Sequence, residues 1–227
     1  YHETESQLHH LDPRVKVVRL GGAGRGFSSG AGISEEDQAS RKEGAPDAVL
    51  LGANRSIRAI VALPKPVIAV VQGPAAGVGV SLALACDLVL ASEKAFFLLA
   101  FTKIGLMPDG GATALVAAAI GRARAMRMAL LAERISAAEA FDFGLISAVY
   151  PADELDAGVA KVITTLASGP AVALRKTKQA INAATLTELE DAIAREEEGQ
   201  RILTTSRDFA EGTKAFQQHR APEFTDS

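Results

Sequence analysis

The chain has 227 residues, of which 48% are hydrophobic and 22% are charged, and this composition is typical of a globular protein with a sizeable core. The formal net charge of −3 at pH 7 argues against nucleic acid as an obligate partner. No apolar run is long enough to span a membrane and no signal peptide opens the chain, so we expect no membrane partner and a cytoplasmic location.

Histidine and cysteine usage disfavours two further classes of site. The four histidines are His2, His9, His10 and His219, so the interior of the sequence has none. A histidine-based triad and a histidine-rich metal site are therefore disfavoured, and we expect no metal ion. The single cysteine, Cys86, lies in an apolar stretch and cannot form an internal disulfide, which favours a reducing compartment.

The first part of the chain predicts a strand, a loop, a charged segment and a helix, in that order. Val15–Leu20 is predicted to be a strand and Gly21–Gly26 a loop. Ile33–Ala48 is charged and punctuated by glycine and proline, which is typical of a mobile surface segment over a site. Val49–Leu63 has the apolar spacing of a helix, and Pro64 ends it.

Two short motifs near the first loop suggest functions that their surroundings do not support. Gly22-Ala23-Gly24 begins like a dinucleotide fingerprint, but the third glycine would fall at Phe27 and no helix begins there. Gly26–Gly30 matches G-x-S-x-G, the nucleophile elbow of α/β-hydrolases, but a long loop rather than a strand precedes Ser28. We therefore disfavour both a dinucleotide site and a hydrolase.

The rest of the chain is organised around Pro64–Ser92. Val67–Val71 is an almost unbroken β-branched run, which predicts a strand that is buried on both faces. A small-residue turn, a helix and a second short strand are predicted at Ala75–Gly79, Val80–Cys86 and Leu88–Ala91. This order of elements predicts an α/β fold.

The glycine-rich turn before the helix has two readings. The first N–H groups of a helix lack intrahelical partners and favour negative charge, and Gly77 and Gly79 would let a ligand approach the backbone closely. Small residues at these positions also permit close packing of a helix on a sheet. The turn by itself favours the interpretation that its small residues serve helix–sheet packing.

Asp109 is the one carboxylate between Glu93 and Glu133, and it precedes a predicted helix that runs to Ile120. Aspartate is common as an N-cap, so Asp109 has a structural explanation as well as a catalytic one.

The C-terminal half is predicted to be mainly helical. Gly121 breaks the chain before a helix at Arg122–Ala132, and capping boxes are predicted at Ser136–Glu139 and Thr185–Glu188. The last strand and the helices after it are predicted at Ile146–Tyr150, Asp153–Ala167, Ala171–Ala184, Leu186–Ile202 and Arg207–Gln218. We therefore predict a core at residues 1–150 and a helical region at residues 151–227.

Five motifs in the right order resemble the crotonase family of enoyl-CoA hydratases and isomerases, and together they cover the chain from about Val15. They are Val17–Ala31, Gln72–Gly79 with Cys86-Asp87 at the end of the following helix, Ile104–Gly111, Arg134–Ile146 and Ala215–Phe224. The resemblance implies a spiral of β-β-α turns, followed by a helical C-terminal trimerisation region in a homotrimer or a dimer of trimers. The family also begins with a further strand pair and an Asn-Arg-Pro-like motif, which this sequence lacks and which would help to hold coenzyme A.

The same resemblance implies an acyl-CoA thioester as substrate, with coenzyme A as part of that substrate and no separate cofactor. It assigns the N–H groups of Ala31 and Val78 to an oxyanion hole for the thioester oxygen of an enolate. It places the adenine end of coenzyme A at the backbone around Ser29, Ala31 and Ile33. Gly77 and Phe101 are the remaining residues predicted to bind substrate.

One departure from the family pattern decides which reaction is expected. Hydratases of the family use two glutamates as acid and base, and Ser81 and Phe101 stand at those positions here. Asp109 matches the place where some isomerases of the family carry a single carboxylate.

Three functions follow from these expectations. The first is a Δ3,Δ2-enoyl-CoA isomerase-like enzyme that uses Asp109 as the base. The second is an enoyl-CoA hydratase (lyase) of fatty acid β-oxidation with atypical acid/base residues. The third is a non-catalytic acyl-CoA-binding protein in which Asp109 only caps its helix.

Overall fold

The computed structural model describes residue 8 and residues 11–32 and 48–225. Its first elements are β1 (Val18–Gly21), α3 (Ala48–Ala62), β2 (Val67–Val71), β3 (Pro74–Ala76), α4 (Val78–Ala85), β4 (Leu88–Ser92), β5 (Phe96–Leu98) and the 3₁₀ helix η1 (Phe101–Ile104). They are followed by α5 (Ala112–Leu131), β6 (Ile135–Ser136), α6 (Ala137–Phe143), β7 (Ala148–Tyr150), α7 (Leu155–Ser168), α8 (Ala171–Thr185), α9 (Leu189–Leu203) and α10 (Arg207–Gln217).

The strands form two sheets, and the chain alternates between them. One sheet has the order β1-β2-β4-β7 with every neighbouring pair parallel. The other has the order β3-β5-β6, in which β3 and β5 are parallel and β5 and β6 antiparallel. β2, β3 and α4 make one β-β-α turn, and β4, β5 and α5 make the next. The α/β class and the predicted spiral of β-β-α turns are confirmed.

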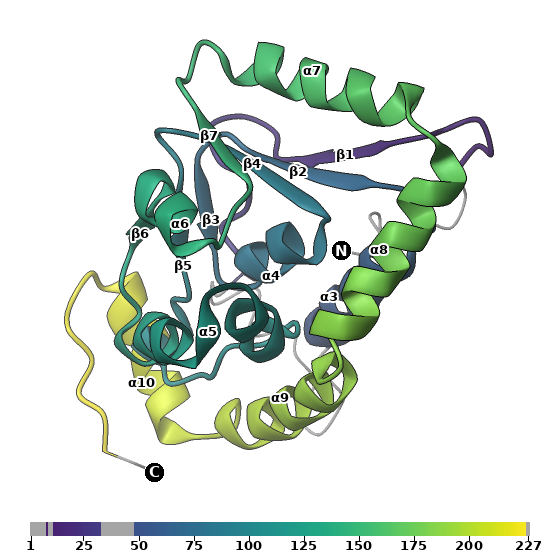
Figure 1. The fold of residues 1–227 in the computed structure, drawn as a ribbon. Helices are drawn as coiled ribbons and strands as arrows, with labels where there is room; N and C mark the ends of the chain where they lie inside the picture. The colour runs from purple at the N-terminus through teal and green to yellow at the C-terminus, as the bar shows by residue number, and fades with distance from the viewer. Residues whose placement is uncertain (1–7, 9–10, 33–47, 226–227) are drawn as a thin grey trace.

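Helices cover both faces of the four-stranded sheet (Figure 1). On one face, Ile68 and Val70 of β2 and Leu90 of β4 pack with Leu155 and Val159 of α7. On the other face, alternate residues of β2 join the main hydrophobic core, to which α3 and α4 also contribute. All five residues of β2 are buried, as its continuous apolar run predicts.

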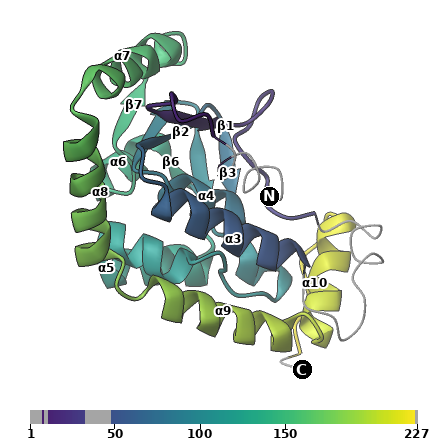
Figure 2. The same cartoon turned by 90° about the vertical axis from the view of Figure 1, so that its right-hand side faces the viewer.

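The C-terminal helices α7–α10 curve around the sheets and the inner helices, as both views of the ribbon show (Figures 1 and 2). Lys178 ties α8 to the core, because its ammonium lies 3.0 Å from Asp87 Oδ2 and donates to the Ile60 carbonyl oxygen at 2.9 Å. α10 packs closely on η1, since a Cβ atom on Gly212 would lie 2.6 Å from the Ile104 backbone. These contacts bring the end of the chain to the residues that follow β5.

The central elements differ from their predicted bounds in two places. The helix predicted from Val80 begins at Val78, so the second glycine of the turn, Gly79, is already helical. Pro74–Ala76, predicted as the end of one strand and part of a turn, forms β3. A short stretch after a proline carries no strand periodicity, and its pairing with β5 comes from tertiary structure.

The two predicted capping boxes have different outcomes. The box at Ser136 is confirmed, since its hydroxyl accepts from the Glu139 N–H and Glu139 accepts from the Ser136 N–H. The box at Thr185 is wrong, because α8 continues through Thr185, whose hydroxyl donates to the Ile181 carbonyl oxygen at 2.8 Å. α9 begins one residue after Glu188 without a side-chain cap.

The predicted break at Gly121 is confirmed, as a kink between two helical segments of α5. The Gly121 backbone (φ 74°, ψ 164°) is not helical, yet helical structure continues on both sides within α5. The predicted domain division at residue 150 falls at the last residue of β7, and it stays a prediction. Among the described residues, no single helix is long and apolar enough to cross a membrane. Taken together, the bent pair α7 and α8 has sufficient length and apolar composition.

Candidate functional site

Two loops from different parts of the chain run side by side beneath the candidate site. Ser28 pairs with Ala75 as a parallel bridge, and the Ala76 N–H donates to the Ser28 carbonyl oxygen at 2.9 Å. A Cβ atom on Gly77 would lie 3.7 Å from the Gly30 Cα atom. The loop that ends in Ala31 and the turn that ends in Gly77 are therefore in direct contact.

The N–H groups of Ala31 and Val78 have no hydrogen-bond partner in the part of the chain that the structure describes. Val78 is the first residue of α4, where a backbone N–H has no intrahelical acceptor. Its N-cap, Gly77, adopts φ 55° and ψ −131°, a conformation that disfavours any residue with a side chain. Both N–H groups are thus available to a ligand that carries an oxygen acceptor.

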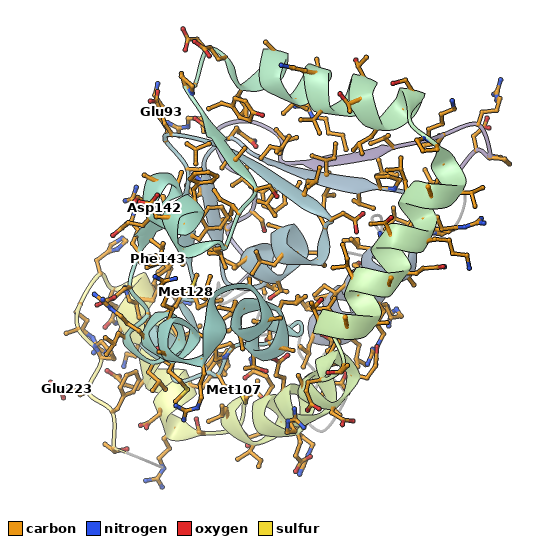
Figure 3. The ribbon with its side chains drawn as sticks, in the orientation of Figure 1. Glu93, Met107, Met128, Asp142, Phe143 and Glu223 are labelled. Atoms are coloured by element: carbon orange, nitrogen blue, oxygen red, sulfur yellow. The ribbon has the colours of Figure 1, made fainter. Side chains whose placement is uncertain are left out.

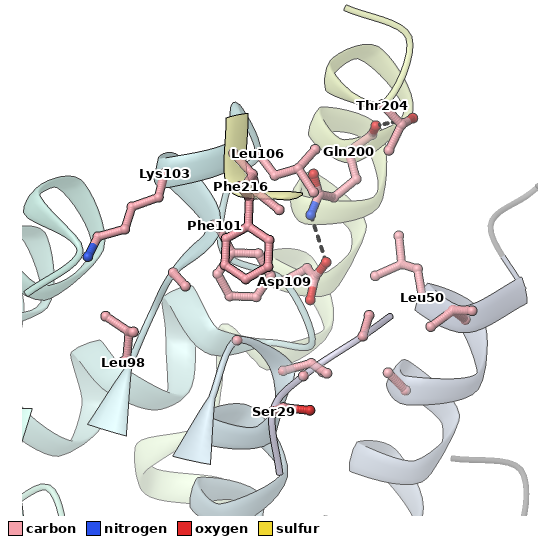
Figure 4. Close-up of a pocket in the computed structure, with 18 residues that line it drawn as sticks. Ser29, Leu50, Leu98, Phe101, Lys103, Leu106, Asp109, Gln200, Thr204 and Phe216 are labelled. Carbon is pink, nitrogen blue, oxygen red and sulfur yellow. Dashed lines mark hydrogen bonds between the residues drawn. The ribbon is translucent and has the colours of Figure 1, made fainter. Parts of the chain in front are cut away.

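Both residues line a cavity of about 290 Å³ that is bordered mainly by apolar side chains (Figure 4). The walls come from the two loops, α3, η1, α9 and α10, so residues from both ends of the described chain meet there. The predicted site residues that line it are Ser29, Ala31, Gly77, Val78, Phe101 and Asp109. The remaining one, Ile33, lies outside the described residues, as does most of the charged segment predicted to cover the site.

The Asp109 carboxylate borders this cavity from the loop between η1 and α5. The Gln200 amide nitrogen donates to Asp109 Oδ2 at 2.7 Å (Figure 4). The Ser81 hydroxyl donates to the Asp109 carbonyl oxygen at 2.8 Å. The side chain and the backbone of Asp109 are therefore each held by a different helix. Among the described residues, Asp109 is the only carboxylate that lines the cavity.

The explanation of Asp109 as an N-cap is wrong. α5 begins at Ala112 with Gly111 as its N-cap residue. The Glu196 carboxylate of α9 accepts from the Gly111 N–H at 2.6 Å, from the Thr113 N–H at 2.8 Å and from the Thr113 hydroxyl at 2.6 Å. A carboxylate from another helix therefore caps α5.

Glu196 and Gln200 are the residues of the site that sequence analysis missed. They continue the helical spacing of Leu189 and Ile193, which face the core from the same side of α9. Polar residues on a buried apolar stripe are a detectable signal, because such groups are costly without partners. The sequence does not identify those partners, which lie more than 80 residues earlier.

Ser81 and Phe101 do not supply a carboxylate to the cavity. Ser81 is fully buried, and its hydroxyl donates a hydrogen bond to the Asp109 carbonyl oxygen. Phe101 lines the cavity with its ring, and a Cβ atom on Gly77 would lie 3.8 Å from the ring's Cζ atom. Besides apolar side chains, the cavity is lined by Asp109 with its partner amide, Gln200, and by Ser29, Lys103 and Thr204.

A second cavity of about 640 Å³ lies between α5, β6 and α6, where Met128 and Phe143 both border it (Figure 3). Its carboxylates are engaged, because Glu133 pairs with Arg127 at 2.7 Å and Glu139 belongs to the Ser136 capping box. None of the predicted site residues borders it. Within the described ranges, no group of three or more histidine, cysteine, aspartate or glutamate side chains could hold a metal ion.

Comparison with known proteins gives a consistent result. A sequence model of the family described as "Enoyl-CoA hydratase/isomerase" matches residues 2–227. The chain is 39% identical to the 1,2-epoxyphenylacetyl-CoA isomerase of Escherichia coli (strain K12), over 94% of this chain and 82% of that protein. It is also 39% identical to a probable enoyl-CoA hydratase of Rhodobacter capsulatus, over 99% of this chain and 86% of that protein.

A solved structure agrees with the sequence matches. The crystal structure of an enoyl-CoA hydratase from Mycobacterium avium subsp. paratuberculosis K-10 superposes with a TM-score of 0.91 at 65% identity, and the match covers 99% of this chain and 87% of that one.

Proposed function

Because the chain belongs to the enoyl-CoA hydratase/isomerase (crotonase) family, we propose that it moves a double bond in an acyl-CoA thioester, as a Δ3,Δ2-enoyl-CoA isomerase does, with Asp109 as its single base. One observation carries this proposal. In the described part of the chain, the Asp109 carboxylate is the only one that shares a cavity with the unpartnered N–H groups of Ala31 and Val78. Double-bond migration needs one base and one oxyanion site, and no second carboxylate.

The proposed reaction balances with these groups alone. The Asp109 carboxylate takes a proton from C2 of a 3-enoyl-CoA, and the electron pair moves into a dienolate whose negative oxygen accepts from the Ala31 and Val78 N–H groups. The Asp109 carboxylic acid then returns the proton to C4, which leaves the 2-enoyl-CoA. Each N–H donor of such a site is typically worth about 3 kcal/mol of the barrier.

Enoyl-CoA hydratase is the alternative activity, and the names of the similar proteins from Rhodobacter capsulatus and Mycobacterium avium favour it. Addition of water needs a base to activate the water and an acid to protonate the enolate carbon. Ser81 is buried and Phe101 is apolar, so among the residues that the structure describes only Asp109 could serve a hydratase in both steps. We therefore expect slow hydration of crotonyl-CoA.

A purely acyl-CoA-binding role is the weakest of the three proposals. It supposed that Asp109 serves only to cap α5, and Glu196 performs that capping. The Asp109 side chain is instead held by Gln200 beside an apolar cavity, a costly arrangement for a protein that only binds its ligand.

The test of the proposal is incubation of the purified protein with a panel of 3-enoyl-CoA and 2-enoyl-CoA thioesters, with the products identified by mass and retention time. We expect 3-enoyl-CoA to become 2-enoyl-CoA faster than crotonyl-CoA is hydrated. Crotonyl-CoA hydration at about 10 s⁻¹ or more would support the hydratase instead. Calorimetry with acetoacetyl-CoA, an enolisable ligand, tests binding separately, and no binding at millimolar ligand would count against all three functions.

The remaining expectations concern cofactors, assembly and location. We propose that no separate cofactor takes part, because coenzyme A is part of the substrate and the proton transfer uses Asp109 alone. We also propose a homotrimer or a dimer of trimers. For location we propose the cytoplasm, since the single cysteine, Cys86, is buried as a free thiol and suits a reducing compartment.

A further inference from the structure

Gln200 of α9 contacts the proposed base directly. Its amide nitrogen donates to Asp109 Oδ2 at 2.7 Å (Figure 4). The same nitrogen donates to the Met107 carbonyl oxygen at 3.0 Å. Both partner oxygens can only accept, so both amide hydrogens are engaged. If the amide group flipped by 180°, it would lose both hydrogen bonds. This arrangement fixes one oxygen of the Asp109 carboxylate against α9.

The other atom of the same amide has no partner in the described part of the chain. Gln200 Oε1 is buried and accepts no hydrogen bond, and the residue as a whole is 3% exposed. A buried acceptor without a donor is unfavourable, and an apolar side chain of similar length would avoid that penalty. The cost of this unpaired oxygen stands against the two hydrogen bonds from the amide nitrogen, of which the one to Asp109 holds the proposed base.

α9 itself is anchored against the loop that carries Asp109. One turn before Gln200, Glu196 accepts from Gly111 and Thr113 at the start of α5. Gly199 lets the two segments approach closely, because a Cβ atom there would lie 2.1 Å from the sulfur of Met107. The amide of Gln200 is thus presented to Asp109 by a helix that is fixed at several points.

We propose that Gln200 is a positioning residue for Asp109: its amide holds one carboxylate oxygen so that the carboxylate keeps a fixed orientation toward the cavity. The inference rests on the proposed role of Asp109 as the base. Gln200 takes no proton and makes no bond in the reaction, and it acts only through the orientation and the charged form of Asp109. The amide hydrogen bond favours that charged form.

The test compares Gln200→Met with the matched control Asn54→Leu. Asn54 is also fully buried, donates its amide nitrogen to a carboxylate oxygen (Glu197 Oε1, 2.8 Å) and leaves its Oδ1 without a partner. Unlike Gln200, it does not line the cavity. Each variant therefore removes one buried hydrogen bond from an amide to a carboxylate at α9. Gln200→Met removes the bond to Asp109, and Asn54→Leu removes a bond away from the cavity.

We expect Gln200→Met to fold with a melting temperature not below that of Asn54→Leu, and to lower kcat for 3-enoyl-CoA isomerisation about tenfold with little change in KM. The midpoint of the Asp109 carboxyl titration, followed by carbon-13 NMR and assigned with Asp109→Asn, moves to higher pH because the bond to the charged form is lost. The neighbouring charged side chains, Lys103 at the cavity and Glu196 on α9, are unchanged in both variants.

A second variant keeps the test decisive if Gln200→Met does not fold. Gln200→Glu places a carboxyl group beside Asp109, and two adjacent carboxylates resist joint ionisation, so the Asp109 midpoint moves up further. An Asp109 midpoint and a kcat equal to those of Asn54→Leu would overturn the role of Gln200. If the unmodified protein isomerises no 3-enoyl-CoA, the proposed function fails, and the titration still decides whether Gln200 controls the Asp109 carboxylate.

Discussion

The position of Asp109 depends on the residue that follows it. Gly110 adopts φ 68°, which favours glycine, and a Cβ atom there would lie 2.9 Å from Ile57 Cδ1 and 2.9 Å from Val78 Cγ2. A side chain at Gly110 would thus push against the first residue of α4, which also carries one of the proposed oxyanion donors. Glycine at this point is required for backbone conformation and for space.

Gly110→Ala and Gly121→Ala separate these two requirements. Gly121 has a similar φ of 74°, but no atom lies within 4 Å of the position of its Cβ atom. We expect Gly121→Ala to lower the free energy of unfolding by about 1–3 kcal/mol through strain alone, and Gly110→Ala to lower it further because it also crowds Val78. Urea unfolding measures both changes. If both variants lose the same free energy of unfolding, the structure around Gly110 relaxes without cost and the crowding of Val78 is not destabilising.

At the scale of residues, the sequence was informative where the backbone makes the site. Ser29, Ala31 and Gly77 belong to two loops in close contact, Val78 follows directly at the start of α4, and all four line the cavity. The partners of Asp109 could not be predicted, because they lie on α9 and their contacts exist only after the chain has folded back. The capping role was misassigned for the same reason.

At the scale of elements, α9 is held to the site by polar contacts inside an apolar interface. Burial raises the pKa of the Glu196 carboxyl, while its hydrogen bonds from Thr113 and Gly111 act in the opposite direction. Glu198 lies two residues after Glu196 and is exposed. A side-chain hydrogen bond from Arg201 lowers the pKa of its carboxyl. The two glutamates should therefore respond to pH in opposite ways.

The pH dependence of unfolding tests this contrast through Glu196→Gln and Glu198→Gln. A carboxyl whose pKa is raised on folding contributes stability that is complete below its unfolded value, near 4.5, and is lost as the pH rises through the folded value. The stability advantage of the parent over Glu196→Gln should therefore shrink as the pH rises from about 4.5 toward neutrality. Its advantage over Glu198→Gln should instead shrink as the pH falls.

Urea unfolding of the parent and both variants between about pH 4 and pH 8 measures these trends. Parallel curves for the two variants would mean that α9 does not place Glu196 in a distinct environment.

Helices and strands with strong periodicity could be predicted, and their ends could not. Val67–Val71 and Arg207–Gln217 lie where the apolar pattern indicates, within one residue. The box at Thr185 failed because a threonine in the last turn of a helix can bond back to the preceding turn as well as cap the next helix. The sequence motif does not distinguish a threonine that caps the next helix from one that bonds back to its own helix.

At the scale of the whole molecule, the surface carries large apolar side chains that one chain leaves exposed. Leu130 and Leu131 at the end of α5 are each 61% exposed, and Phe216 of α10 is 59% exposed. Among the large apolar side chains of the C-terminal segment, Phe209 is buried within the chain, Leu203 is partly buried, and Phe216 and Phe224 are exposed. The exposed ones support the proposed assembly.

Light scattering with size-exclusion chromatography tests the proposed assembly. We expect a mass three or six times that of the 23.6 kDa chain at micromolar concentration. Leu131→Glu places a charge on the exposed end of α5 and should shift the distribution toward smaller species if that surface is in the interface. A stable monomer of the unmodified chain would contradict the proposal.

The order of the five motifs along the chain was enough to predict the fold through their resemblance to the family, and the successive turns β2-β3-α4 and β4-β5-α5 agree with it. The reaction could not be predicted with the same certainty, because it depends on which side chains face one small cavity.

The central claim is that Asp109 is the base, and the rate of 3-enoyl-CoA to 2-enoyl-CoA isomerisation by Asp109→Asn tests it most directly. Asparagine keeps the size of the side chain, and its oxygen can still accept from the Gln200 amide, but it cannot take up the proton. We predict an unchanged melting temperature, retained binding of acyl-CoA and a loss of isomerisation of about a hundredfold or more. An Asp109→Asn variant that isomerises as fast as the parent would contradict the account.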